Sequence, residues 1–62
     1  MPRIYVEWFE GRSKEVRDAL AKKITQDVVE IVPGARPEAV NIVFKENPKE
    51  KVYKAGVAAS ER

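Results

Sequence analysis

The sequence predicts an α+β protein whose protomer is a β-α-β unit: a parallel strand pair, one long helix and a short C-terminal hairpin. Residues 3–9 and 40–45 alternate between apolar and polar types, which indicates strands, and the apolar residues between 14 and 32 recur at helical spacing. A strand, a helix and a second strand in this order almost always close with the two strands parallel. We expect residues 1–62 to form a single domain of one layer of strands and one helix.

The first strand has two unequal faces. One face carries Ile4, Val6 and Trp8, and the opposite face carries Arg3, Tyr5, Glu7 and Phe9. We expect the first face to contact the helix. Tyr5 and Phe9 give the second face more apolar surface than a monomer usually leaves in water, so another subunit is expected to cover it.

The helix is predicted from residue 14 to residue 32. Gly11 allows a turn after the strand, and Ser13 suits the N-cap because its hydroxyl can accept a hydrogen bond from a free backbone N–H of the first turn. The helical stripe then consists of Val16, Leu20, Ile24, Val28 and Ile31. Pro33-Gly34 ends the helix.

The second half of the chain predicts a turn at residues 36–39, a strand at 40–45 and a polar turn at 46–50. In the strand, Val40, Ile42 and Phe44 share one face, and Asn41, Val43 and Lys45 share the other. Residues 51–54 can pair briefly, as an edge or as a cross-subunit hairpin, before Ala55-Gly56. Residues 57–62 are too few to have a core of their own.

Length and composition exclude several classes of function. A chain of 62 residues buries only about 60% of its unfolded surface, and without cysteine or histidine it has no disulfide and no usual zinc ligands, so we expect a homo-oligomer. The same absence excludes Ser-His-Asp and Cys-His catalysis, and we expect no metal and no cofactor. A net charge of +2, spread along the chain, does not predict nucleic-acid binding. No apolar run or signal-like segment predicts a membrane location, so we expect a cytoplasmic protein.

The N-terminus offers one candidate catalytic group. Removal of Met1 would turn Pro2 into a secondary amine that the adjoining strand holds in place, which makes it a candidate general base. If Met1 stays, the Pro2 nitrogen is a tertiary amide without basic character. The carboxylates could serve as acids or bases in principle, but we interpret them as surface charge: Glu7, Glu10, Glu46 and Glu50.

The order of these motifs resembles the 4-oxalocrotonate tautomerase family nearly end to end. The resemblance lies in Pro2, the strand after it, Glu10-Gly11-Arg12-Ser13, the amphipathic helix, the strand 40–46 and the segment Val52-Tyr53-Lys54-Ala55-Gly56. It implies protomers that pair into dimers with a four-stranded sheet, a hexamer built as a trimer of dimers, and active sites at subunit boundaries. It also implies a role in aromatic compound degradation, with Pro2 moving a proton between enol and keto forms of a small unsaturated acid and Arg12 binding its carboxylate.

Two positions depart from the family pattern. Asn41 stands where the best-characterised members carry a second arginine, and it can donate a hydrogen bond to the carbonyl oxygen but brings no charge. Val52 aligns with the family's aromatic wall, with Tyr53 one place away, and either would line the substrate pocket. The alternatives are a non-catalytic structural or partner subunit on the same scaffold, or the same amine used to hydrate or dehalogenate unsaturated acids.

Overall fold

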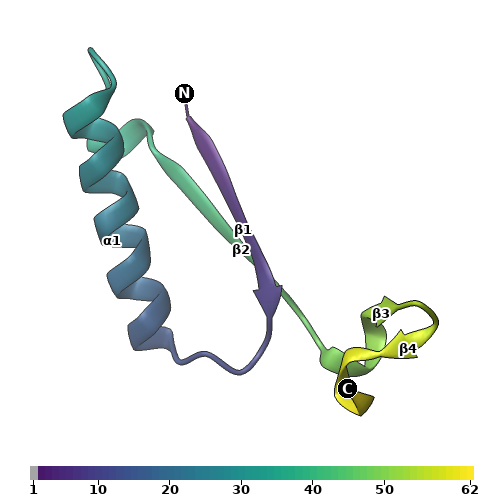
Figure 1. Ribbon diagram of the computed structural model, residues 1–62. Coiled ribbons are helices and arrows are strands. Elements are labelled where there is room, and N and C mark those ends of the chain that lie inside the picture. Colours follow the sequence, from purple (N-terminus) through teal and green to yellow (C-terminus); the bar gives the residue numbers. More distant parts are fainter. Residues whose placement is uncertain (1) are drawn as a thin grey trace.

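The structure, a computed structural model, describes residues 2–62 (Figure 1). Met1, and with it the question of its removal, lies outside the described residues. The main elements in chain order are β1 (Arg3–Phe9), α1 (Lys14–Ile31), β2 (Asn41–Asn47), β3 (Tyr53–Lys54) and β4 (Val57–Ala58). Three 3-10 turns separate or follow them: η1 (Pro37–Ala39), η2 (Lys49–Lys51) and η3 (Ala59–Glu61). This order confirms the predicted β-α-β unit with a C-terminal hairpin.

β1 and β2 form a parallel pair in which Arg3 lies opposite Asn41 and Phe9 opposite Asn47. The predicted bounds of the second strand, 40–45, were wrong at both ends. Val40 does not enter the strand because its N–H donates to the Pro37 carbonyl at 3.1 Å and closes η1. At the other end the pairing continues for two more residues, so the segment predicted as a turn at 46–50 begins as strand.

α1 begins where Ser13 predicts. The Ser13 hydroxyl accepts a hydrogen bond from the Val16 N–H at 3.3 Å, which satisfies one free donor of the first turn. The helix ends at Ile31, one residue earlier than predicted, because Val32 is already extended. Gly34 then turns the chain at a φ of 79°, a backbone conformation that residues with a side chain rarely adopt.

The C-terminal segment folds on itself. β3 and β4 pair antiparallel within the chain, and the Ala59 N–H donates to the Val52 carbonyl at 2.7 Å. Ala58, at 3% exposure, is the one buried residue between positions 2 and 62. Residues 57–62 do not bury Ala58 by themselves: it is buried because the segment pairs back onto residues 49–54.

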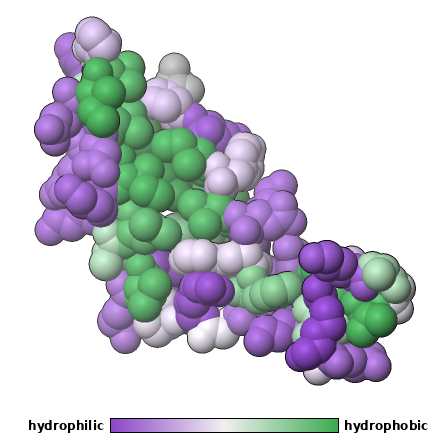
Figure 2. All heavy atoms as spheres, viewed as in Figure 1, coloured by the Kyte–Doolittle hydropathy of each residue, from purple (hydrophilic) through white to green (hydrophobic). Residues whose placement is uncertain are grey.

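The chain as a whole is open. Its radius of gyration is 15.0 Å, whereas a compact chain of this length has roughly 11 Å. Its accessible surface is 4908 Å², against about 4,000 Å² for a folded monomer of this mass. Figure 2 shows a continuous apolar band between charged margins, and Figure 1 shows the C-terminal hairpin extending away from the sheet and α1. Within the described chain, α1 is not apolar enough to cross a bilayer.

Candidate functional site

The amino-terminal end of the sheet brings two of the predicted site residues together. The Asn41 N–H donates to the Pro2 carbonyl at 3.0 Å, which extends the parallel pairing by one residue and holds Pro2 against β2. The Asn41 side-chain amide donates to the Ala39 carbonyl at 3.2 Å through Nδ2, and this nitrogen has a second N–H. Pro2 and Asn41 thus form one half of the candidate site.

The carboxyl-terminal end of the sheet brings together two others. Arg12 and Val52 line a pocket of about 480 Å³, and the remaining lining residues are Glu7, Trp8, Phe9 and Asn47. This volume is within the range of small-ligand sites. The pocket carries both signs of charge, since Arg12 is cationic and Glu7 is held by a 2.9 Å hydrogen bond from Asn47 Nδ2 to its carboxylate.

The two halves are far apart in one chain. Pro2 precedes the seven-residue strand β1 and Arg12 follows it, so the strand rise separates Pro2 from Phe9, the last strand residue before the Arg12 loop, by about 23 Å. Tyr53 lies in neither half: it is 66% exposed in β3 and does not line the pocket with Arg12. One protomer by itself therefore does not gather the predicted residues around a common point.

Arg12 has neighbours that the sequence did not identify. Its guanidinium lies 4.3 Å from the centroid of the Trp8 ring and donates to the Phe9 carbonyl at 2.9 Å. Behind this contact, Glu46 forms an ion pair with Arg17 of α1 at 3.2 Å, and their side chains are only 25% and 32% exposed. The interpretation of Glu46 as surface charge was therefore wrong. Extending the predicted second strand by one residue would have paired Glu46 with Trp8 and indicated this.

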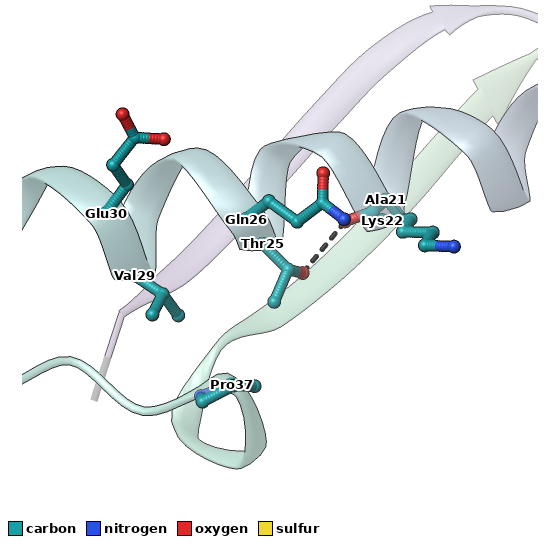
Figure 3. Close-up of a pocket in the computed structure, with 7 residues that line it drawn as sticks. All are labelled: Ala21, Lys22, Thr25, Gln26, Val29, Glu30 and Pro37. Carbon is teal, nitrogen blue, oxygen red and sulfur yellow. Dashed lines mark hydrogen bonds between the residues drawn. The ribbon is translucent and has the colours of Figure 1, made fainter.

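A second hollow lies along α1, beside η1. Its volume is about 490 Å³ and its lining consists of Ala21, Lys22, Thr25, Gln26, Val29, Glu30 and Pro37. Figure 3 shows Thr25 and Val29 pointing from α1 toward Pro37, whereas Glu30 points away from it. The surface is mainly apolar, although Lys22 and Glu30 are among its lining residues, and none of the predicted site residues lies there. Among residues 2–62 no cluster of three His, Cys, Asp or Glu side chains could hold a metal ion.

Comparison with known proteins gives a consistent result across the whole chain. Residues 2–62 match the family model described as tautomerase enzyme. The chain is 39% identical to the 2-hydroxymuconate tautomerase of Comamonas testosteroni, covering 98% of this chain and 95% of that protein. It is 36% identical, over the full length of both, to a probable tautomerase of Halalkalibacterium halodurans. Among solved structures, TomN, a 4-oxalocrotonate tautomerase homologue of the tomaymycin biosynthetic pathway, superimposes with a TM-score of 0.86 at 34% identity, covering 98% of this chain and 92% of TomN.

Proposed function

Because this chain belongs to the tautomerase family, that of 4-oxalocrotonate tautomerase, we propose that it is a cytoplasmic isomerase acting on a small unsaturated 2-hydroxy or 2-oxo carboxylic acid. The reaction moves a proton between enol oxygen and carbon. One observation carries the proposal: on a scaffold of this family, Pro2 lies with Asn41 at one end of the sheet, and Arg12 lies with Val52 at the other end.

Pro2 is the proposed general base and acid. After removal of Met1, its secondary amine accepts the proton of the enol hydroxyl and leaves an enolate, whose oxygen electrons form the keto C=O bond as the carbon–carbon double bond is protonated. The electrons of the carbon–carbon double bond then take a proton at carbon from the protonated Pro2 nitrogen, which returns to its neutral form. The backbone hydrogen bond from Asn41 to Pro2 supports this role because it fixes the amine in space.

Arg12 and Asn41 are the proposed substrate-binding groups. A guanidinium can donate two parallel hydrogen bonds to a carboxylate, which fixes both position and orientation. Asn41 lies beside Pro2, and the second N–H of its amide can donate to the carbonyl oxygen as negative charge develops there. Val52 supplies an apolar wall next to Arg12. Tyr53 is the remaining candidate for the pocket lining, from a neighbouring protomer.

We propose that the complete site forms between subunits of a homo-oligomer, most simply a hexamer built from three dimers. Three observations support this: the distance of about 23 Å between the two halves, the open shape of the chain and the apolar hollow on α1. The face of Thr25 and Val29 beside Pro37 in Figure 3 is of the kind that a second helix covers. Assembly would bring Pro2 of one protomer to the Arg12 pocket of another.

The test begins with the N-terminus. Intact mass spectrometry should find the protein without Met1, and the ketonisation of 2-hydroxymuconate and phenylenolpyruvate should then be followed spectroscopically. We expect turnover that falls sharply in Pro2→Ala. A matched pair of proteins, one with an uncleaved N-terminal extension and one with the same extension at the C-terminus, separates the amine from the fold. We expect only the second to be active.

Three results would count against the proposal. Unchanged activity in Pro2→Ala would remove Pro2 as the base. A correctly processed, assembled protein without activity on either enol would favour the alternative, a non-catalytic structural or partner subunit, to which the uncharged Asn41 is suited. Release of halide from 3-chloroacrylate would instead indicate hydration or dehalogenation by the same amine.

A further inference from the structure

Arg12 lies in a surface loop, where a long cationic side chain normally samples many rotamers. Ordering such a side chain on ligand binding costs up to about 2 kcal/mol of conformational entropy. A carboxylate site gains affinity if the guanidinium is already held in the binding pose. The contacts around Arg12 therefore bear on how tightly the pocket can bind an acid.

The side chain of Arg12 is held on one side by Trp8. The guanidinium stacks 4.3 Å from the indole centroid, and the indole in turn stacks on Phe44 with ring centroids 5.3 Å apart and planes inclined by 26°. The indole N–H donates to Glu46 Oε2 at 3.0 Å. Packing and hydrogen bond together fix the plane on which the guanidinium lies.

The backbone of Arg12 is held by a second route that ends at the same carboxylate. Arg17 of α1 donates to the Arg12 carbonyl at 3.0 Å through Nη1. The same Nη1 lies 3.2 and 3.3 Å from the two oxygens of Glu46. Glu46 thus connects to the side chain of Arg12 through Trp8 and to its backbone through Arg17. β1, β2 and α1 each contribute one residue to this arrangement.

We propose that Glu46 is a positioning residue which, through Trp8 and Arg17, holds Arg12 ready for a substrate carboxylate. This inference rests on the proposed function, because it takes Arg12 as the carboxylate ligand. It adds that affinity for the acid depends on a residue that does not line the pocket. A merely structural ion pair would affect the stability of the fold and leave carboxylate affinity unchanged.

The single tryptophan of the chain gives a direct measurement. Because Arg12 lies on Trp8, a carboxylate that binds Arg12 should change Trp8 fluorescence. We would titrate the processed, assembled protein with crotonate, an unsaturated monocarboxylate without an enol, and use crotonamide as the uncharged control. We expect a saturable signal with crotonate that is absent in Arg12→Ala.

Glu46→Gln is the decisive variant, with Glu38→Gln in the exposed turn η1 as the matched control. We expect the crotonate dissociation constant and the KM for phenylenolpyruvate to rise about tenfold in Glu46→Gln, with a much smaller change in kcat, and neither to change in Glu38→Gln. In an Arg12→Ala background, Glu46→Gln should cause no further rise in KM, because its effect passes through Arg12.

Each other outcome overturns the inference. If the crotonate dissociation constant of Glu46→Gln equals that of the wild type, Glu46 has no role in carboxylate binding. The proposed function is then unaffected. If Glu46→Gln and Arg12→Ala raise KM independently, so that their effects add, Glu46 acts on the stability of the fold and not through Arg12. Crotonate binding that survives Arg12→Ala removes Arg12 itself as the ligand, whereas the Pro2 variants report separately on proton transfer. If Glu46→Gln does not assemble, Trp8→Phe, which keeps a ring but loses the N–H, is judged by the same KM criteria.

Discussion

Pro2 and Arg12 lie beyond opposite ends of β1, whose rise separates Pro2 from Phe9, the last strand residue before the Arg12 loop, by about 23 Å. A parallel β-α-β protomer cannot bring them together, because residues before and after one strand are separated by the whole length of that strand. Any chemistry that uses both residues therefore needs two chains. This relationship leads to a test by subunit exchange.

We predict that two variants of low activity complement each other. Pro2→Ala keeps a normal Arg12, and Arg12→Ala keeps a normal Pro2, so a mixed oligomer contains some sites in which both groups are intact. Random mixing of equal amounts should restore about a quarter of the wild-type rate, since each intact group comes from its required subunit half of the time. The measurement is ketonisation of phenylenolpyruvate after co-refolding. If activity stays at the level of the separate variants, both groups act from one chain.

We predict that Asn41→Asp lowers kcat about 10²-fold or more with a smaller change in KM. The substitution keeps the size of the side chain but replaces the amide donor with a negative charge, next to the oxygen on which negative charge develops. Asn41→Arg, which supplies a charged donor, should raise kcat. Initial rates at saturating enol distinguish these effects. Equal rates for all three proteins would show that residue 41 does not approach the carbonyl oxygen.

Glu7 should influence which acids the pocket prefers. It lines the same pocket as Arg12, and its carboxylate opposes a second negative charge on the ligand. We predict that Glu7→Gln raises the ratio of kcat/KM for the diacid 2-hydroxymuconate to that for the monoacid phenylenolpyruvate by several-fold. Glu10→Gln, an exposed loop position outside the pocket, is the control and should leave the ratio unchanged. A ratio unaffected by Glu7→Gln would place bound substrate away from this carboxylate.

The fold was largely predictable because its signals are local. Alternation along residues 3–9 gave β1, and Ser13 and Pro33-Gly34 gave the limits of α1 to within one residue. The second strand was less certain: Glu46 and Asn47 look like a polar turn in isolation, and only their pairing with Trp8 and Phe9 keeps them extended. Long-range pairing of this kind is not encoded in a short window of sequence.

The candidate site was predictable only as a set of residues. Arg12 and Val52 do share a pocket, and Pro2 and Asn41 do lie together. The separation of these two pairs follows from the strand length, which the sequence also contains. The support of Arg12 by Glu46 was not predictable, since it depends on how a helix residue, Arg17, meets the end of β2.

The last prediction concerns stability and the turn between β3 and β4. Ala55 and Gly56 have φ values of 53° and 79°, so this two-residue hairpin turn places an alanine in the left-handed region. Asparagine tolerates that conformation better than alanine, because its side chain can bond to the local backbone. We predict that Ala55→Asn stabilises the protein by about 0.5–1 kcal/mol per chain.

Gly56→Ala is the control, for which we expect the opposite effect. A Cβ there meets no atom within 4 Å, so its expected cost of about 1 kcal/mol comes from the backbone conformation alone. Denaturant unfolding at one fixed protein concentration measures both, because the stability of an oligomer depends on concentration. Destabilisation by Ala55→Asn would contradict this prediction. It would mean that the Ala55 methyl group contacts a neighbouring subunit, where the larger asparagine side chain does not fit.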